Sequence, residues 1–351
     1  MKGSEKLANT RKTVYNNITS DEKMAKVNPE NISLGDDFIE YLTSVDRAKS
    51  TIESYKADLK IIWVLVHDLA GNKFFVELSK RDIVKIQNHC LNVFGWSPAR
   101  MRRIKSTMSS LSNYIENMLD DEYDFRPIVR KIENPASAPV REKTVLTEEQ
   151  IQTLLDAMVE KGRYDIACML ALGVYSGRRK SELTRMKVSY FTEENVIYGS
   201  LYKTPEKVKT KGRGSRGKLL NVYVLKKQFQ PYLDLWMKYR EENGITSEWL
   251  IPKKENGVWL DEPVPTTTLD SWADIFTRIL GIPVYWHSMR HRFATALSEA
   301  SIPDSVIQDI VGWESADMCR LYIDTDVDTK FEKYFGEDGI KQVEQKSLAD
   351  M

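Results

Sequence analysis

Cysteine, long apolar runs and repeated segments are all scarce or missing in this chain of 351 residues. Its three cysteines, Cys90, Cys168 and Cys319, form no Cys-x-x-Cys pair and cannot all pair with one another. A disulfide framework and a zinc site are therefore not expected. No apolar run approaches the roughly 18 residues of a membrane span, and the first residues lack the apolar stretch of a signal peptide. We expect a cytoplasmic protein that makes no contact with a membrane.

The chain also has no net charge, because it contains 51 basic and 51 acidic residues. Bulk charge thus argues neither for nor against a nucleic-acid partner. The basic residues are unevenly spread, however, and two strips at 96–106 and 203–218 contain almost no acid. Such strips suit a groove that follows a phosphate backbone, although either one alone fits a solvated face equally well. The residues that we expect to contact DNA are Arg100, Arg102, Arg103 and Lys105 in the first strip and Lys207, Arg213 and Arg216 in the second.

Length and composition predict two domains with tails. The chain is too long for one ordinary core, and 42% hydrophobic with 29% charged residues is typical of a globular protein. Residues 1–33 are polar and predict a flexible arm, or a short helix that awaits a partner. We expect a helical domain at 34–132, a proline-containing linker at 133–145, a second domain at 146–335 and a tail at 336–351.

Capping signals divide the first domain into four helices. An apolar cluster from Phe38 indicates the first helix, and Ser50-Thr51-Ile52-Glu53 has the pattern of a capping box for the second. Ser79 is a candidate cap for the third helix. Ser97-Pro98 precedes the fourth, whose apolar stripe leaves the first basic strip on the opposite face. The members of that stripe are Met101, Ile104, Met108, Leu111 and Ile115.

The second domain is predicted to be mainly α-helical with a small β-sheet. Thr147-Glu148-Glu149-Gln150 has the pattern of another capping box, and two helices follow up to Gly177. β-Branched and aromatic residues near 196–198 and 219–225 indicate short strands, separated by a glycine-rich basic hairpin. Further helices are expected at about 228–242, 267–280, 288–300 and 304–311. The fold class is therefore α+β.

Groups suited to a phosphodiester recur in an ordered set along the second domain. Arg179 lies in the segment 176–183, and His287 and Arg290 are three apart, which places both on one side of a helix. A Gly turn with Trp313 follows, and Tyr322 lies nine residues further. Arginine grips phosphate oxygens in bidentate fashion, and a phenol can attack phosphorus to form a covalent intermediate. The set predicts DNA strand cleavage through a protein–phosphate ester.

Three segments resemble the signature boxes of the tyrosine recombinase (phage integrase) family. They are Ser176-Gly177-Arg178-Arg179-Lys180-Ser181-Glu182-Leu183, His287-Ser288-Met289-Arg290-His291-Arg292-Phe293-Ala294-Thr295, and Val311-Gly312-Trp313 through Tyr322. The likeness covers about 145–335, and the four-helix unit resembles that family's core-binding (SAM-like) domain. It implies that Tyr322 is the nucleophile and forms a 3′-phosphotyrosine. Arg179 and Arg290 would hold the non-bridging oxygens.

The resemblance also implies roles for the surrounding residues. His287 would assist proton handling, and Trp313 stands where many members have His; an indole can donate a hydrogen bond but cannot accept a proton. A hairpin lysine would protonate the leaving oxygen, with Lys211 the first choice and Lys209 the alternative. Glu182 would orient Arg179. From the residues alone, we expect His291 to satisfy a core hydrogen bond and Arg178 to form a salt bridge at a helix end.

The function implied is site-specific DNA recombination by a homotetramer on double-stranded DNA with inverted-repeat half-sites. Strands would be exchanged through a Holliday junction in integration or excision of a mobile element or phage, or a related event. The phosphotyrosine conserves the bond energy, so no metal or cofactor is expected. Nucleoid association and accessory DNA-bending or directionality proteins would fit. The aromatic segment at 331–335 could pack on a neighbouring subunit or on its own domain. A type IB topoisomerase and a catalytically silent DNA-binding regulator are the alternatives.

Overall fold

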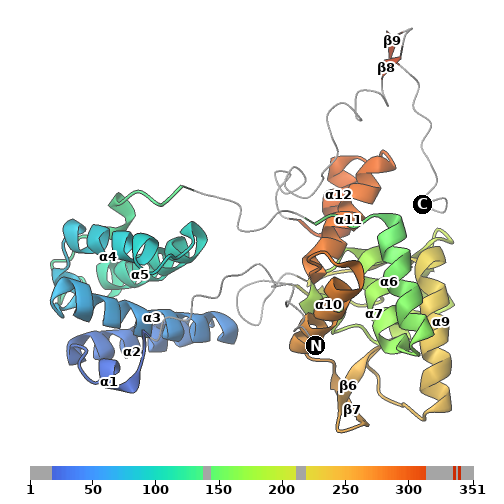
Figure 1. Cartoon of the computed structure of the whole chain (residues 1–351), viewed down its shortest axis with the longest axis horizontal. Coiled ribbons are helices and arrows are strands. Elements are labelled where there is room, and N and C mark those ends of the chain that lie inside the picture. The colour runs from blue at the N-terminus through green and yellow to red at the C-terminus, as the bar shows by residue number, and fades with distance from the viewer. Residues whose placement is uncertain (1–17, 137–143, 211–218, 314–334, 337–338, 341–351) are drawn as a thin grey trace, which may run out of the picture. The chain divides into compact units, whose positions relative to one another are not determined.

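A computed structural model describes residues 18–136, 144–210, 219–313, 335–336 and 339–340. These residues belong to two compact units, one formed by 18–136 and one that begins at residue 144 (Figure 1). The first unit is helical. The second combines helices with short strands, as the α+β prediction required. No helix among the described residues is long and apolar enough to cross a membrane.

The helical unit consists of five α-helices and two short 3-10 helices around one apolar core. Helix α3 (Lys49–Ala70) packs against α2 (Pro29–Ser44), α4 (Lys80–Asn92) and α5 (Pro98–Met118), and one face of it contributes Leu59, Ile62 and Trp63 to the core. The other elements are α1 (Asp21–Met24), η1 (Phe75–Glu77) and η2 (Val129–Lys131).

Three of the expected helix starts in the two units are confirmed and one is wrong. Ser79 and Thr147 each form a capping box, and Ser97 accepts a hydrogen bond from the Arg100 amide. Ser50 does not cap α3, because the helix begins at Lys49 with Ala48 at the N-cap position and Ser50 lies inside the first turn. A capping side chain must precede the helix to reach its unpaired amides, so the Ser50–Glu53 pattern cannot act as a cap.

The expected arm at 1–33 is too long. Helix α2 begins at Pro29, capped by the Asn28 side chain, and Ile18 and Val27 are buried in the core of the helical unit. Two buried aliphatic side chains outweigh the polar composition of this stretch. Residues 1–17 lie outside the described residues, as do residues 137–143 of the expected linker.

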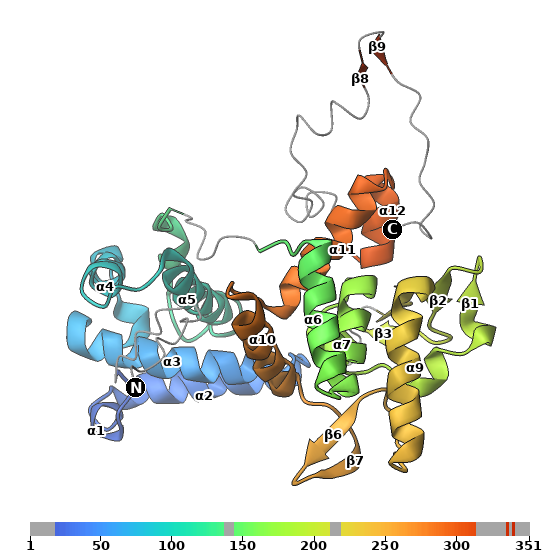
Figure 2. The same ribbon diagram turned by 45° about the vertical axis from the view of Figure 1, so that its right-hand side comes forward.

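The second unit is built around the buried helix α7 (Tyr164–Ser176), which packs against α6 (Glu148–Glu160), α9 (Lys226–Glu242) and α11 (Trp286–Glu299) (Figure 2). Nearly every side chain of α7 is buried, which explains its almost uniformly apolar sequence. Short helices α8 (Lys180–Leu183), η3 (Val188–Tyr190) and η4 (Glu193–Asn195) follow it. Helices α10 (Thr266–Leu280) and α12 (Asp304–Val311) complete the helical part.

The strands of this unit are short and antiparallel. Strand β2 (Leu201–Lys203) lies between β1 (Val196–Ile197) and β5 (Tyr223–Leu225), and β3 (Val208–Lys209) pairs with β4 (Leu219–Leu220). The sequence did not predict a further hairpin of β6 (Pro252–Glu255) and β7 (Val258–Pro263), which turns at Asn256-Gly257. The residue pairs Phe335–Gly336 and Gly339–Ile340 form β8 and β9.

Candidate active site

Arg179 is held at the junction of α7 and α8 by Glu182. Helix α7 ends at Gly177, which adopts a left-handed conformation with φ of 59°. Nη1 of Arg179 lies 3.0 Å from Oε1 of Glu182, and Oε2 of Glu182 accepts a hydrogen bond from the Arg179 amide. Glu182 is 1% exposed, whereas the Arg179 side chain is 29% exposed. Glu182 thus fixes the guanidinium from the protein side and leaves part of it open to solvent.

Arg290 is brought to the same place by α11. Its side chain is fully buried, and Nη1 donates a 2.9 Å hydrogen bond to the carbonyl oxygen of Gly177. Gly177 lies two residues before Arg179. The structure therefore brings together two arginines that are more than one hundred positions apart in the sequence.

Gly177, at the end of α7, lies directly against Phe293 of α11. A Cβ at this position would overlap the ring of Phe293 on α11. We expect Gly177→Ala to lower the free energy of unfolding by about 1–3 kcal/mol, through overpacking and backbone strain. Gly281→Ala is the matched control, because Gly281 is also left-handed, at the end of α10, but a methyl group added there would meet no atom within 4 Å. Chemical denaturation would compare them, and equal losses would contradict the packing argument.

His287 lies beside both arginines. Its ring is 5.3 Å from that of His291, centroid to centroid, with the planes at 87°. Loss of hydration lowers the pKa of His287 to about 4, and the positive charges of His291, Arg290 and Arg179 act in the same direction. Although the residue as a whole is exposed, its ring packs on His291 and loses part of its hydration there. His287 is consequently neutral at neutral pH and surrounded by cationic groups.

The depressed pKa predicts a pH dependence of stability. The folded pKa of His287 lies below its ordinary value of 6.5, so the unfolded chain binds more protons between pH 6.5 and about 4. The free energy of unfolding should therefore fall as the pH is lowered through this window. In His287→Gln that part of the decline should disappear, as urea titrations at several pH values would reveal. Parallel pH profiles for the two proteins would contradict the assignment.

Trp313 closes the site from the end of α12. It is 3% exposed, and the Arg290 guanidinium carbon lies 5.6 Å from its ring centroid. Gly312 ends α12 in a left-handed conformation with φ of 77°. His291 is 7% exposed and packs on His287. The core hydrogen bond expected of it stays a prediction.

Arg178 forms no salt bridge with any residue that the structure describes, in contrast to the expectation. It is 1% exposed, and Nη2 donates to the carbonyl oxygens of Asn221 and Ile310. Burial lowers the pKa of this guanidinium to about 10. Arg178 thus links the end of α7 to the segment between β4 and β5 and to α12. The sequence pattern did not indicate these contacts.

The structure describes some of the lysine and tyrosine candidates and not others. Lys209 belongs to β3, and its carbonyl oxygen accepts a hydrogen bond from Arg185 at 2.6 Å. Lys207 is exposed just before it. Lys211, Arg213, Arg216 and Tyr322 lie outside the described residues.

The first basic strip is largely engaged by the helical unit itself. Asp58 of α3, 3% exposed, forms ion pairs with Arg100 at 2.9 Å and Arg103 at 3.0 Å. Arg102 donates to the carbonyl oxygen of Pro135. The one sequence signal for these ion pairs is an acidic residue, Asp58, among the apolar residues of α3. Arg100 and Arg103 keep part of their surface exposed and remain candidates for DNA contact.

Lys105 was wrongly assigned to a DNA-facing surface. It is 4% exposed, and its ammonium group donates to the carbonyl oxygens of Ile132 and Glu133. Loss of hydration lowers its pKa. The lysine instead fixes the segment after η2 against α5.

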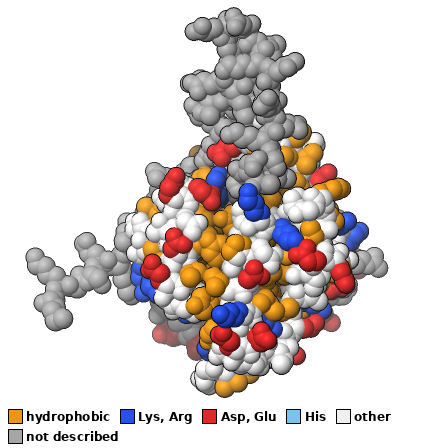
Figure 3. Space-filling view, turned by 90° about the vertical axis from the view of Figure 1, so that its right-hand side faces the viewer, with side chains coloured by type: hydrophobic (Ala, Val, Ile, Leu, Met, Phe, Trp, Pro, Cys, Tyr) orange, Lys and Arg blue, Asp and Glu red, His pale blue; other side chains and the backbone are white. Residues whose placement is uncertain are grey.

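On the face shown in Figure 3, acidic and basic side chains are intermixed with hydrophobic ones.

Comparison with known proteins gives consistent matches. The family model described as the phage integrase family matches residues 144–328. The SPbeta prophage-derived recombinase-like protein YomM of Bacillus subtilis is 29% identical over 269 residues, which cover 74% of this chain and 77% of that protein. Tyrosine recombinase XerC of Shewanella amazonensis is 23% identical over 299 residues, which cover 82% and 90%.

Solved structures share the fold. XerH recombinase bound to palindromic difH substrate superposes with a TM-score of 0.64 at 16% identity, over 86% of this chain and 94% of that chain. The Tn1549 transposon integrase in complex with transposon right end DNA gives 0.61 at 15% identity, over 85% and 98%. These likenesses show that the chain shares the overall fold of these proteins.

Proposed function

Because this chain belongs to the phage integrase family and is a tyrosine-type site-specific recombinase, we propose that it cuts and rejoins DNA through a 3′-phosphotyrosine on Tyr322. The observation that supports this most is the buried hydrogen bond from Arg290 to the carbonyl of Gly177. It assembles Arg179, Arg290 and His287 into one cationic site. Such a site suits a phosphate on which negative charge builds up.

The proposed reaction balances without an external energy source. The Tyr322 phenol gives up its proton, which neutral His287 can accept, and its oxygen bonds to phosphorus while the bond to the 5′-oxygen breaks. The 5′-oxygen takes a proton from a lysine. Rejoining reverses the steps, since a 5′-hydroxyl attacks the phosphotyrosine and releases the phenol. Arg179 and Arg290 hold the non-bridging oxygens, and Glu182 positions Arg179. Neutral His287 can accept or relay a proton beside them.

Lys211 is the proposed general acid, with Lys209 the alternative. Lys211→Ala should slow cleavage by about 10²-fold, because the 5′-oxygen then leaves without a proton. A substrate with sulfur in place of the bridging 5′-oxygen tests this directly, because a thiolate leaves readily unprotonated. The variant should cleave the sulfur substrate at nearly the wild-type rate. If Lys209→Ala shows this rescue and Lys211→Ala does not, the roles are exchanged.

The DNA partner proposed is a duplex with two inverted half-sites, bound by two protomers and joined with a second duplex in a tetramer. A λ integrase tetramer bound to a Holliday junction has the same fold, with a TM-score of 0.60 at 18% identity. Strand exchange through such a junction is what we propose here. Arg100, Arg102, Arg103, Lys207, Arg213 and Arg216 would make salt-dependent backbone contacts.

The prophage origin of YomM favours integration or excision of a mobile element as the biological event. Accessory DNA-bending or directionality proteins would then control its direction. Inverted repeats around a short spacer beside the reading frame would support this assignment.

The experiment that tests the proposal traps the covalent intermediate. A duplex carrying the cognate site and a nick next to the scissile phosphate loses its 5′-hydroxyl fragment on cleavage, so rejoining is blocked. Mass spectrometry of the trapped peptide should identify a nucleotide linked through its 3′-phosphate to Tyr322. Tight DNA binding without any adduct would instead indicate a silent regulator. Relaxation of supercoiled DNA that lacks a specific site would indicate a type IB topoisomerase.

A further inference from the structure

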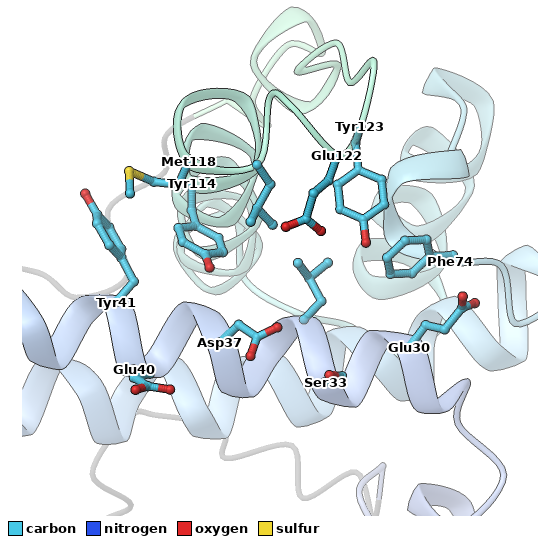
Figure 4. Close-up of a pocket in the computed structure, with 12 residues that line it drawn as sticks. Glu30, Ser33, Asp37, Glu40, Tyr41, Phe74, Tyr114, Met118, Glu122 and Tyr123 are labelled. Carbon is cyan, nitrogen blue, oxygen red and sulfur yellow. The ribbon is translucent and has the colours of Figure 1, made fainter.

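An acidic groove with an apolar floor lies on the helical unit, between α2 and the end of α5 (Figure 4). Its volume is about 510 Å³. Leu34, Phe74, Tyr114 and Leu119 contribute to its floor, and the carboxylates of Glu30, Asp37, Glu40 and Glu122 line its sides. In the part of the chain that the structure describes, no lysine or arginine lines it.

The four groove carboxylates differ from several other acids of this unit, whose charges are paired with basic side chains. Asp58, Asp68, Asp82 and Glu116 each form an ion pair with an arginine or lysine. Among the described residues, the four groove carboxylates have no ion-pair partner. Helix α2 also carries no basic residue.

The negative charge of the groove affects Tyr114, which lines it. Burial raises the pKa of its phenol, and the charges of Asp37, Glu122 and Glu40 raise it further. Negative charge at this groove repels a DNA backbone, so the groove, whose apolar floor is only partly accessible, is suited to a basic protein segment instead.

We propose that the basic N-terminal segment of the same chain, residues 1–17, docks in this groove. The segment carries Lys2, Lys6, Arg11 and Lys12 against a single acid, Glu5. Its apolar residues Leu7, Val14 and Tyr15 match the aromatic and aliphatic floor. The charges and the apolar surfaces of segment and groove are therefore complementary.

The attachment point makes this intramolecular contact feasible. Residue 17 is followed by Ile18, which is buried in the core of the unit that carries the groove. Seventeen residues reach at most about 60 Å when extended. A compact unit of this size has a radius of gyration of only about 14 Å. A short tether also holds the segment at an effective concentration of order millimolar.

The test uses the full chain with a photoreactive benzoyl-phenylalanine in place of Tyr15. Irradiation should give a cross-link to peptides of α2 or of the segment 114–123, within a single chain on a denaturing gel. In the combined variant Asp37→Asn, Glu40→Gln and Glu122→Gln, the yield should fall at least about fivefold, the loss expected for three surface charge pairs. Asp36→Asn is the matched control, because Asp36 is an exposed acid of α2 that does not line the groove.

Three outcomes would overturn the proposal. Cross-links that map away from the groove would place the segment elsewhere. An unchanged yield in the combined variant, with an unchanged circular dichroism melt, would show that the carboxylates are not the recognition element. Cross-linked dimers in place of monomers would make a second copy the donor of the segment. None of these outcomes depends on DNA cleavage by Tyr322.

Discussion

Replacing Tyr322 with phenylalanine is expected to abolish the covalent protein–DNA adduct while leaving DNA binding intact. The substitution removes one oxygen, and that oxygen is the atom proposed to bond to phosphorus. Loss of a catalytic nucleophile lowers the rate by at least about 10⁴-fold. The measurement is adduct formation on the nicked cognate duplex, resolved on a denaturing gel, alongside a binding titration.

Tyr198→Phe is the matched control for this experiment. Tyr198 lies between β1 and β2 and is 90% exposed, so its hydroxyl should be dispensable. Its adduct yield should equal that of the wild type. An adduct that persists in Tyr322→Phe and vanishes in another tyrosine variant would transfer the nucleophile to that residue.

Arg290→Lys is expected to slow adduct formation by about 10²–10³-fold, the usual loss when one donor to a developing anion is removed. A lysine can satisfy the Gly177 carbonyl or reach the phosphate, whereas the guanidinium has donors for both. Because DNA binding draws on many backbone contacts, the dissociation constant should change much less. Single-turnover rates at saturating DNA separate the two quantities.

Arg292→Lys provides the comparison on the same helix. Arg292 pairs with Glu148 and Glu299 and takes no part in the site, so its substitution should leave the rate nearly unchanged. Thermal unfolding of both variants would exclude a general loss of folding. A cleavage rate for Arg290→Lys within tenfold of the wild type would refute the proposed role.

The sequence predicted the parts of the fold that depend on local signals. Ser79, Ser97 and Thr147 precede helices because their hydroxyl oxygens accept amide hydrogen bonds of the first turn. Ser50 has the same pattern but lies two positions late, and nothing local distinguishes the two cases. The burial of Ile18 and Val27 depends on packing against distant helices, which composition does not encode.

In the candidate active site, too, the sequence predicted local features but not tertiary contacts. The spacing of His287 and Arg290, together with the family resemblance of the segment around Arg179, was sufficient to nominate these residues. It could not reveal that Arg290 is held by a main-chain oxygen, that Arg178 donates to two carbonyls, or that Lys105 is buried. Each of these contacts joins residues at least 27 positions apart, so each is a property of the tertiary structure.

The hydrogen bond between Arg290 and the Gly177 carbonyl couples the positions of the two arginines that we propose to bind the phosphate. The end of α7 cannot shift without displacing both guanidinium groups together, so their separation is set before any substrate arrives. Little reorganisation energy then remains to be supplied when the phosphate enters. Control over when the enzyme acts must consequently fall on steps other than the alignment of these two side chains.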